Sequence, residues 1–171
     1  MTVLITDRLT LTPVQASDFP DLCALFGDIE FTRLIFGRTL GPEEVWFRAL
    51  RDIGHWEAMG YGNWAARLRE GGDLVGTFGV LHYKREMTPA FDAPELGWGL
   101  SPRFQGQGLA FEALSAALAW CDDALNAPRT VCMISPDNAP SLALAARAGY
   151  VRYAGTTYKD GAVVLSERVA R

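Results

Sequence analysis

The hydrophobic and polar positions of the N-terminal region predict a strand followed by a helix. From Val3 to Val14 apolar and polar residues alternate well enough for a strand. Ser17-Asp18 is typical of a helix cap, so the first helix is expected from Phe19 to Phe26. The stretch from Phe31 to Leu40 is aromatic and has no period, which indicates a loop able to shape a pocket.

A second helix and a hairpin are predicted next. Gly41-Pro42-Glu43-Glu44 places proline and acids where a helix begins, and the helix should end near Met59-Gly60. The runs Gly62 to Leu68 and Leu74 to Tyr83 have the composition of strands. Because Glu70-Gly71-Gly72-Asp73 is a strong turn signal between them, the two strands should be antiparallel.

The second half of the chain predicts strands that alternate with helices. An irregular connection from Lys84 to Ala93 leads to a short strand, Pro94 to Leu100. A long helix rich in Ala and Leu should run from Gly106 to Leu125, and Arg129 to Ile134 should form a strand.

Two strands and a helix complete the predicted order. A helix from Asn138 to Ala148 should stop at Gly149, and a strand should follow from Tyr150 to Tyr158. Lys159-Asp160-Gly161 then turns the chain into a last strand through Val169. The order is β-α-α-β-β-β-α-β-α-β-β, without repeats or linkers, and we expect one α/β domain over residues 1–171.

Composition places the chain among soluble globular proteins. It has 171 residues, of which 49% are hydrophobic and 21% charged, enough for one substantial core without disulfides or metals. The apolar runs are too short to span a bilayer, and the first residues lack a basic leader before an apolar stretch, so we expect a cytoplasmic protein with no membrane partner.

The cysteines, the histidines and the net charge each argue against one kind of site. Cys23, Cys121 and Cys132 are widely spaced in apolar surroundings, which favours small buried thiols in a reducing compartment. His55 and His82 have no partner at metal-ligand spacing, so no metal site is predicted. The net charge is −4 and the basic residues are scattered, which argues against nucleic acid binding.

A glycine-containing segment is the most informative motif. Arg103-Phe104-Gln105-Gly106-Gln107-Gly108-Leu109-Ala110 opens the long helix, and two glycines there let backbone N–H groups converge on an anion such as a pyrophosphate. The glycines alone are weak evidence, because they also occur as helix caps. No P-loop Gly-Lys-Ser/Thr follows, and Phe111 stands where a dinucleotide fingerprint needs a small residue.

In its context the segment resembles the GNAT family of acyl-CoA-dependent N-acetyltransferases. Gly97-Trp98-Gly99-Leu100 precedes it, Asn138-x-x-Ser141 and Gly149-Tyr150 follow it, and the element order matches over essentially the whole chain. The family's loop, Arg/Gln-x-x-Gly-x-Gly/Ala, is matched by Arg103, Gly106 and Gly108. The resemblance implies a GNAT fold: a mixed, mostly antiparallel sheet of about seven strands with four helices on both faces.

The resemblance also implies a binding site for acetyl-CoA as co-substrate. The N–H groups from Phe104 to Ala110 would hold the pyrophosphate, and the backbone from Trp98 to Leu100 would pair with the pantetheine arm. Asn138 and Ser141 would contact the cofactor, although Asn138 could equally be a helix cap. The cofactor residues implied are therefore Trp98, Leu100, Arg103, Phe104, Gln105, Gly106, Gln107, Gly108, Leu109, Ala110, Asn138 and Ser141.

Within the family, Glu95-Leu96-Gly97-Trp98 and Thr6-Asp7-Arg8-Leu9-Thr10-Leu11 look like the RimJ/RimL-type branch, which includes enzymes that acetylate protein N-termini. Many relatives carry a tyrosine in the fourth helix as general acid, and its position here is Ala145. Ser141 could instead protonate the leaving thiolate, or only contact the cofactor. Glu95 is the candidate base, with pairing to a nearby Arg as its structural alternative.

The sequence is compatible with more than one acceptor and offers several candidate residues for the acceptor site. Phe31, Arg33 and Trp98 are candidate substrate contacts, and Arg33 could read an acceptor carboxylate or simply be solvated. A protein or peptide N-terminal amine is the first expectation, since its amino group is more readily neutral than that of lysine. A small amine (amino acid, polyamine or antibiotic) is the alternative. A non-catalytic acyl-CoA sensor and a nucleotide-binding oxidoreductase are rivals of other classes, and the chain could be a monomer or a homodimer.

Overall fold

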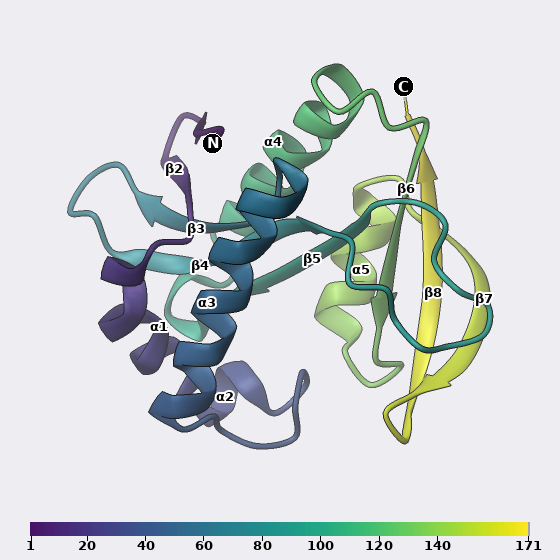
Figure 1. Cartoon of the computed structure of the whole chain (residues 1–171), viewed down its shortest axis with the longest axis horizontal. Coiled ribbons are helices and arrows are strands. Elements are labelled where there is room, and N and C mark those ends of the chain that lie inside the picture. Colours follow the sequence, from purple (N-terminus) through teal and green to yellow (C-terminus); the bar gives the residue numbers. More distant parts are fainter. Residues whose placement is uncertain (171) are drawn as a thin grey trace.

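The computed structural model describes residues 1–170, and within them the chain forms one sheet of eight strands covered by helices (Figure 1). The elements are β1 (Leu4–Ile5), β2 (Leu9–Pro13), α1 (Phe19–Phe26), α2 (Ile29–Thr32), α3 (Pro42–Met59), β3 (Asn63–Leu68), β4 (Leu74–Leu81), β5 (Glu95–Leu100), α4 (Leu109–Asp123), β6 (Arg129–Ile134), α5 (Ala139–Arg147), β7 (Val151–Tyr158) and β8 (Gly161–Val169). Short 3₁₀ turns lie at Ala16–Asp18 and Pro102–Phe104.

The sheet has the strand order β1-β2-β3-β4-β5-β6-β8-β7. All neighbouring pairs are antiparallel except β5 and β6, which are parallel. The mixed, mostly antiparallel α/β architecture predicted from the sequence is therefore confirmed.

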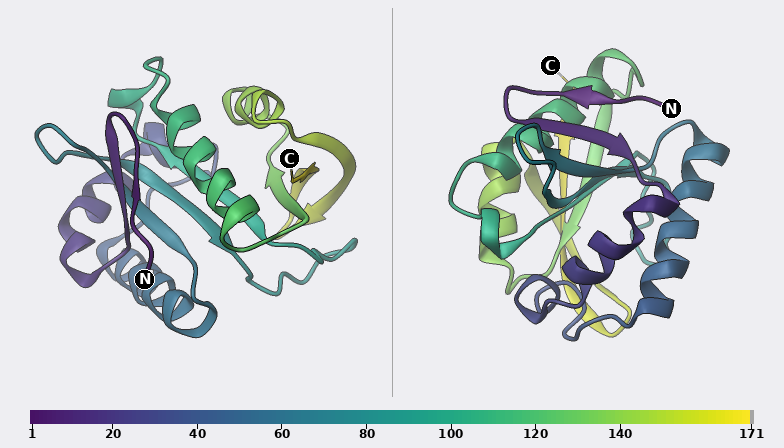
Figure 2. Two further views of the ribbon diagram at one scale, coloured as in Figure 1. Left: turned by 90° about the horizontal axis from the view of Figure 1, so that it is seen from above. Right: turned by 90° about the vertical axis from the view of Figure 1, so that its left-hand side faces the viewer.

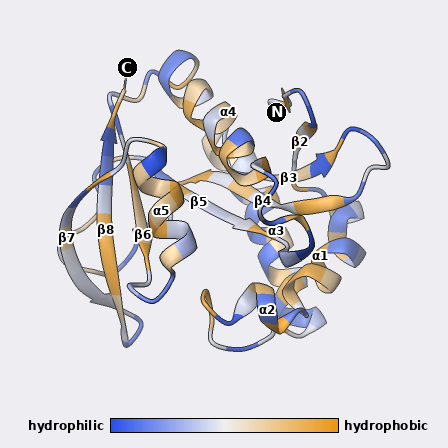
Figure 3. Cartoon of the chain, turned by 180° about the vertical axis from the view of Figure 1, so that it is seen from behind, coloured by the Kyte–Doolittle hydropathy of each residue, from blue (hydrophilic) through white to orange (hydrophobic). Residues whose placement is uncertain are grey.

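The helices form two layers, one on each face of the sheet (Figure 2). Helices α1, α2 and α3 pack through one apolar cluster that contains Leu22, Phe26 and Val45. Helices α4 and α5 lie on the other face, where Leu114 and Ala145 belong to a larger cluster with the inward residues of β4 and β5. The connecting loops at the rim are mostly hydrophilic (Figure 3).

Three boundaries differ from the sequence prediction. The single strand expected from Val3 to Val14 is wrong, because a turn closed by the Thr6 N–H donating to the Leu9 carbonyl (2.9 Å) divides it into β1 and β2. The short helix α2, which the sequence did not predict, ends inside the aperiodic segment at Thr32. Helix α4 begins at Leu109 and not at Gly106, since Gly106 and Gly108 have φ of +75° and +78°, outside the helical region.

The feature that positions the site is the parting of β5 from β6. Strand β5 pairs with β4 along its whole length, from Leu81↔Glu95 to Gly76↔Leu100. Toward β6 only Glu95↔Val131 is paired, and the Val131 N–H donates to the Pro94 carbonyl at 2.9 Å. Beyond Glu95 the β5 edge that faces β6 is therefore open.

Candidate active site

A cleft of 410 Å³ lies where β5 and β6 part. It is lined by β5, by the loop before α4, by the first turn of α4, by α5 and by the segment around α2. The lining residues are Glu30, Phe31, Arg33, Leu34, Ile35, Trp98, Gly99, Leu100, Pro102, Gln105, Gly106, Gly108, Ala110, Phe111, Asn138, Pro140, Ser141, Leu144 and Arg147.

The glycine loop forms one end of the cleft as a cradle of backbone. Gly108 is the N-cap of α4 in the left-handed region, so the first N–H groups of the helix point out of its N-terminus without partners inside it. Within residues 1–170 the N–H groups from Gly106 to Ala110 donate to no protein acceptor. A helix N-terminus with free donors and a favourable dipole suits a pyrophosphate, so the loop fits the cofactor that the sequence implies.

Hydrogen bonds and an ion pair connect the glycine loop and α4 with the turn between β1 and β2. The Arg8 guanidinium donates to Glu112 in the first turn of α4 (Nε to Oε2, 2.7 Å) and to the Gln107 carbonyl (2.9 Å). Thr6 also donates to Glu112 at 2.6 Å. Burial acts to raise the pKa of Glu112, but the hydrogen bonds from Thr6 and Arg8 outweigh it and hold that pKa below its usual value. The loop is thus tied to β1 and β2.

Helix α5 and strand β5 meet across the cleft through Trp98 and Ser141. Asn138 caps α5, its Oδ1 accepting from the Ser141 N–H at 3.2 Å, which is the alternative role the sequence offered. The Trp98 indole N–H donates to Ser141 Oγ at 3.3 Å. Because Oγ accepts this bond, the hydroxyl proton of Ser141 can be donated to another group. Ala145, at the expected tyrosine position, is buried in the core.

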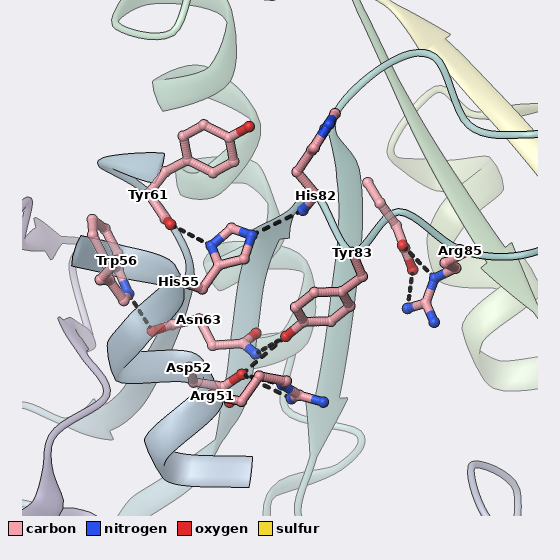
Figure 4. A network of polar contacts seen from close by, with 10 residues as sticks. Arg51, Asp52, His55, Trp56, Tyr61, Asn63, His82, Tyr83 and Arg85 are labelled. Carbon is pink, nitrogen blue, oxygen red and sulfur yellow. Dashed lines mark hydrogen bonds and ion pairs between the residues drawn. The ribbon is translucent and has the colours of Figure 1, made fainter. Parts of the chain in front are cut away.

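Glu95, the candidate base, is held by an arginine. It is 5% exposed, and its carboxylate accepts two hydrogen bonds from Arg85, Nε to Oε2 at 2.6 Å and Nη2 to Oε1 at 2.8 Å (Figure 4). Arg85 also donates to the Tyr158 hydroxyl at 3.1 Å. The arrangement is the ion pair that the sequence offered as the alternative to a catalytic role.

A second cavity of 230 Å³ lies beside this ion pair. Tyr83, Arg85 and Glu95 are among its lining residues. The Tyr83 hydroxyl donates to Asp52 of α3 at 2.9 Å, and burial together with that carboxylate raises the pKa of Tyr83. Tyr83 is therefore a neutral hydrogen-bond donor at physiological pH.

A histidine contact nearby fixes one tautomer (Figure 4). His55 Nε2 accepts the backbone N–H of His82 at 3.0 Å, so the proton of a neutral ring is on Nδ1, 2.6 Å from the Tyr61 carbonyl. This contact joins α3 to the end of β4.

The structure brings most of the sequence-predicted residues to the cleft. Four of the implied cofactor residues do not line it: Arg103, whose guanidinium lies over the Phe104 ring, Phe104 and Leu109, which are buried, and Gln107. Of the acceptor candidates, Phe31 covers Gly99, so that a side chain at Gly99 would collide with the Phe31 ring. Arg33 lines the cleft and pairs with Glu30 at 3.3 Å.

Arg147 and Phe111 had no assigned role in the sequence analysis, and they meet in the cleft with the Arg147 guanidinium 3.9 Å from the ring centroid. Arg147 lies just before the Gly149-Tyr150 motif, but nothing in its spacing links it to Phe111 on another helix.

The thiols take no part in the cleft. Burial raises the pKa of Cys121 and Cys132 to about 12, so both stay protonated at neutral pH. Among residues 1–170 no group of three or more His, Cys, Asp or Glu residues is arranged to hold a metal ion. None of the helices in that range combines the length and apolarity needed to cross a bilayer.

The α/β domain thus combines a glycine loop at a helix N-terminus with a parallel strand pair that parts beside it, and both border one cleft. Residues 8–151 match the acetyltransferase (GNAT) domain, and the chain belongs to this family of N-acetyltransferases. It is similar, at 26% identity over 84% of its length and 79% of the other, to an uncharacterized N-acetyltransferase, p20, of Bacillus licheniformis. Over 42% of the chain and 37% of the other it is 33% identical to the [ribosomal protein uS5]-alanine N-acetyltransferase of Escherichia coli.

Solved structures have the same fold. A GNAT-family acetyltransferase of Bordetella pertussis is 32% identical and superposes with a TM-score of 0.88 over 99% of this chain and 100% of that one. A ribosomal L7/L12 α-N-protein acetyltransferase, RimL, in complex with coenzyme A is 18% identical with a TM-score of 0.78, covering 99% and 98% of the two chains, and shares the fold.

Proposed function

We propose that the chain transfers an acetyl group from acetyl-CoA directly to the α-amino group of a peptide or protein N-terminus. The observation that carries the proposal is the open edge of β5 beside the Gly106–Gly108 cradle, both of which line one cleft. The cradle suits the pyrophosphate, and the β5 edge has free backbone groups for the amide-containing arm. When bound, acetyl-CoA supplies an activated acetyl thioester.

We choose an α-amine as the acceptor because few side chains of the site could accept the proton of the amine. Glu95 is occupied by Arg85, and the cleft lining contains one carboxylate, Glu30, which pairs with Arg33. A peptide N-terminus has a reference pKa of about 7.7 to 8.0, so part of it is already neutral at physiological pH. A lysine, at about 10.4, needs a strong base. The relatives described as ribosomal-protein alanine acetyltransferases support the same choice.

Ser141 is proposed as the proton donor for the departing thiolate. Its Oγ accepts the Trp98 indole N–H, which leaves the hydroxyl proton for the cleft. We expect Ser141→Ala to lower kcat by about a hundredfold, the lower end of the range for general acid catalysis, while the Kd for acetyl-CoA changes little. Turnover and calorimetric binding measure the two effects, and an unchanged kcat would restrict Ser141 to a contact role.

The function is tested by incubating the protein with acetyl-CoA and three sets of acceptors. These are peptides with a free N-terminus, matched peptides with a blocked N-terminus and an internal lysine, and small amines including amino acids and polyamines. Mass spectrometry locates the acetyl group, and a thiol-reactive dye follows the release of coenzyme A. Products on free N-termini alone are expected. Products on small amines alone would favour the alternative acceptor class, and binding without thiol release would favour a sensor.

A further inference from the structure

One arginine of α3 has no counter-charge within contact distance. Glu44 is bound to Arg38 at 2.5 Å, Asp52 to Arg51 at 2.8 Å, and Glu95 to Arg85. Arg48 of α3 differs from these three arginines. Within residues 1–170 it makes no hydrogen bond and no ion pair, and its Nε is buried without a partner.

The surroundings of Arg48 hold its guanidinium in place without neutralising it. Its Cζ lies 4.8 Å from the centroid of Phe26 and 4.9 Å from that of Phe36. Burial, followed by repulsion from Arg51, lowers its pKa, while Asp52 acts in the opposite direction. A guanidinium stays charged in proteins, and a buried charge is costly unless it is paired. The aromatic contacts offset part of this cost. An anion bound to the guanidinium would offset more of it.

The position of Arg48 connects it with the reacting end of the cleft. Its neighbour Phe26 contacts Phe31 edge to face, with centroids 5.4 Å apart, and Phe31 lies on Gly99 of β5. On the other side, the charge of Arg48 interacts with that of Arg85, beside the second cavity. Arg48 is thus linked through Phe26 to Phe31, which lines the cleft.

We propose that Arg48 binds a carboxylate of the acceptor, so that the preferred substrates carry an acidic side chain close to their α-amine. This inference rests on the proposed function and names its substrate class. The planar guanidinium is suited to a carboxylate, and a hydrogen bond between two charged groups in a partly buried site discriminates strongly against a neutral amide.

The test compares peptides that differ only by Glu and Gln, or Asp and Asn, at the second or third residue, all with amidated C-termini. For the unaltered enzyme, we expect kcat/KM to be about tenfold or more higher for the acidic member of a pair. Free amino acids are compared with their amides in the same way. If kcat/KM differs for this pair and for none of the peptide pairs, the carboxylate that Arg48 binds belongs to a small acid.

Arg48→Met keeps the length and apolar contact of the side chain and should abolish this preference, mainly through KM, without changing the Kd for acetyl-CoA. Arg48→Lys should restore part of it. Arg69→Met, which removes an exposed arginine on the β3–β4 turn, is the matched control and should keep the preference.

Three results would overturn the inference. One is equal kcat/KM for acidic and neutral peptides with the unaltered enzyme, a result that does not depend on whether any variant folds. Another is an acidic preference that survives in folded Arg48→Met. The third is a preference lost equally in Arg69→Met. Failure to acetylate any amine would instead reject the proposed function, so the two failures are distinguishable.

Discussion

The sequence allows two roles for Glu95, catalytic base and partner of an arginine, and its contacts in the structure correspond to the second. A carboxylate on the strand beside the expected thioester position satisfies the requirement for a base. The structure adds Arg85, ten positions earlier, whose guanidinium also lies 5.3 Å and 5.0 Å from the ring centroids of Tyr83 and Tyr158. Glu95 therefore holds the 84–94 connection against the sheet.

At the residue scale we predict that the main effect of Glu95→Gln is a lower free energy of unfolding and not a slower chemical step. The substitution leaves a buried guanidinium without its counter-charge, which costs about 3 kcal/mol of unfolding free energy. Glu30→Gln, in the exposed pair with Arg33, is the control and should change little. Urea unfolding measures both variants. A Glu95→Gln protein of normal stability that has lost turnover across the pH range would establish Glu95 as the base.

The sequence predicts the local backbone conformation of several candidate residues. Gly106, Gly108 and Asn138 act through conformation or capping, which a few neighbours determine. Arg48 and Arg147 could not be found in the same way, because their contacts come from Phe26, Phe36 and Phe111 on other elements.

At the scale of elements, the sequence located helices and strands and misplaced some ends. Helix α1 has the predicted bounds, and α3 runs from Pro42 to Met59 as expected. The division of the first strand into β1 and β2 was missed, because Thr6 and Arg8 turn toward Glu112, over a hundred residues away. A long-range contact of this kind has no local signal.

The contact between the β1–β2 turn and α4 predicts a pH-dependent stability. Since the folded protein holds the pKa of Glu112 below its usual value, Glu112 stabilises the fold above that usual value, and the contribution is lost as the pH falls through the folded pKa. The unfolding free energy of the unaltered protein should therefore exceed that of Glu112→Gln at pH 7, and the difference should shrink below about pH 4.

Urea titrations of both proteins between pH 7 and pH 3 measure this difference. Glu57→Gln, on the exposed side of α3, provides the baseline and should show no such trend. A Glu112→Gln difference that is constant over the whole pH range would mean that packing, and not charge, makes the contact.

At the scale of the whole molecule, the sheet consists of two parts joined at one point. Strands β1 to β5 lie on one side of the molecule and strands β6 to β8 on the other (Figure 1), and the two parts meet through the single parallel pairing at Glu95 and Val131. The cleft opens beyond this pairing. The resemblance of the motifs implied this fold, but the pattern of apolar residues alone does not specify which two strands part.

A ligand that contacts both parts should stabilise their junction. We predict that acetyl-CoA at a hundredfold excess over its Kd raises the unfolding free energy by about 2.7 kcal/mol. Hydrogen exchange should slow in Leu96–Leu100, in the loop before α4 and in the first turn of α5. Slowing confined to the loop would contradict binding along the open edge of β5, and the unligated protein is the reference.

The position of Trp98 has an optical consequence. Trp64 contacts both Trp56 and Trp120 edge to face, and Trp46 packs against Phe19. Of the five tryptophans, Trp98 is the one that lines the cleft, with its indole N–H on Ser141. Indole emission depends on the polarity of its immediate surroundings, so a molecule that enters the cleft changes the fluorescence of Trp98 while the other tryptophans supply a nearly constant background. The protein thereby carries its own fluorescent reporter of cleft occupancy, readable without any label.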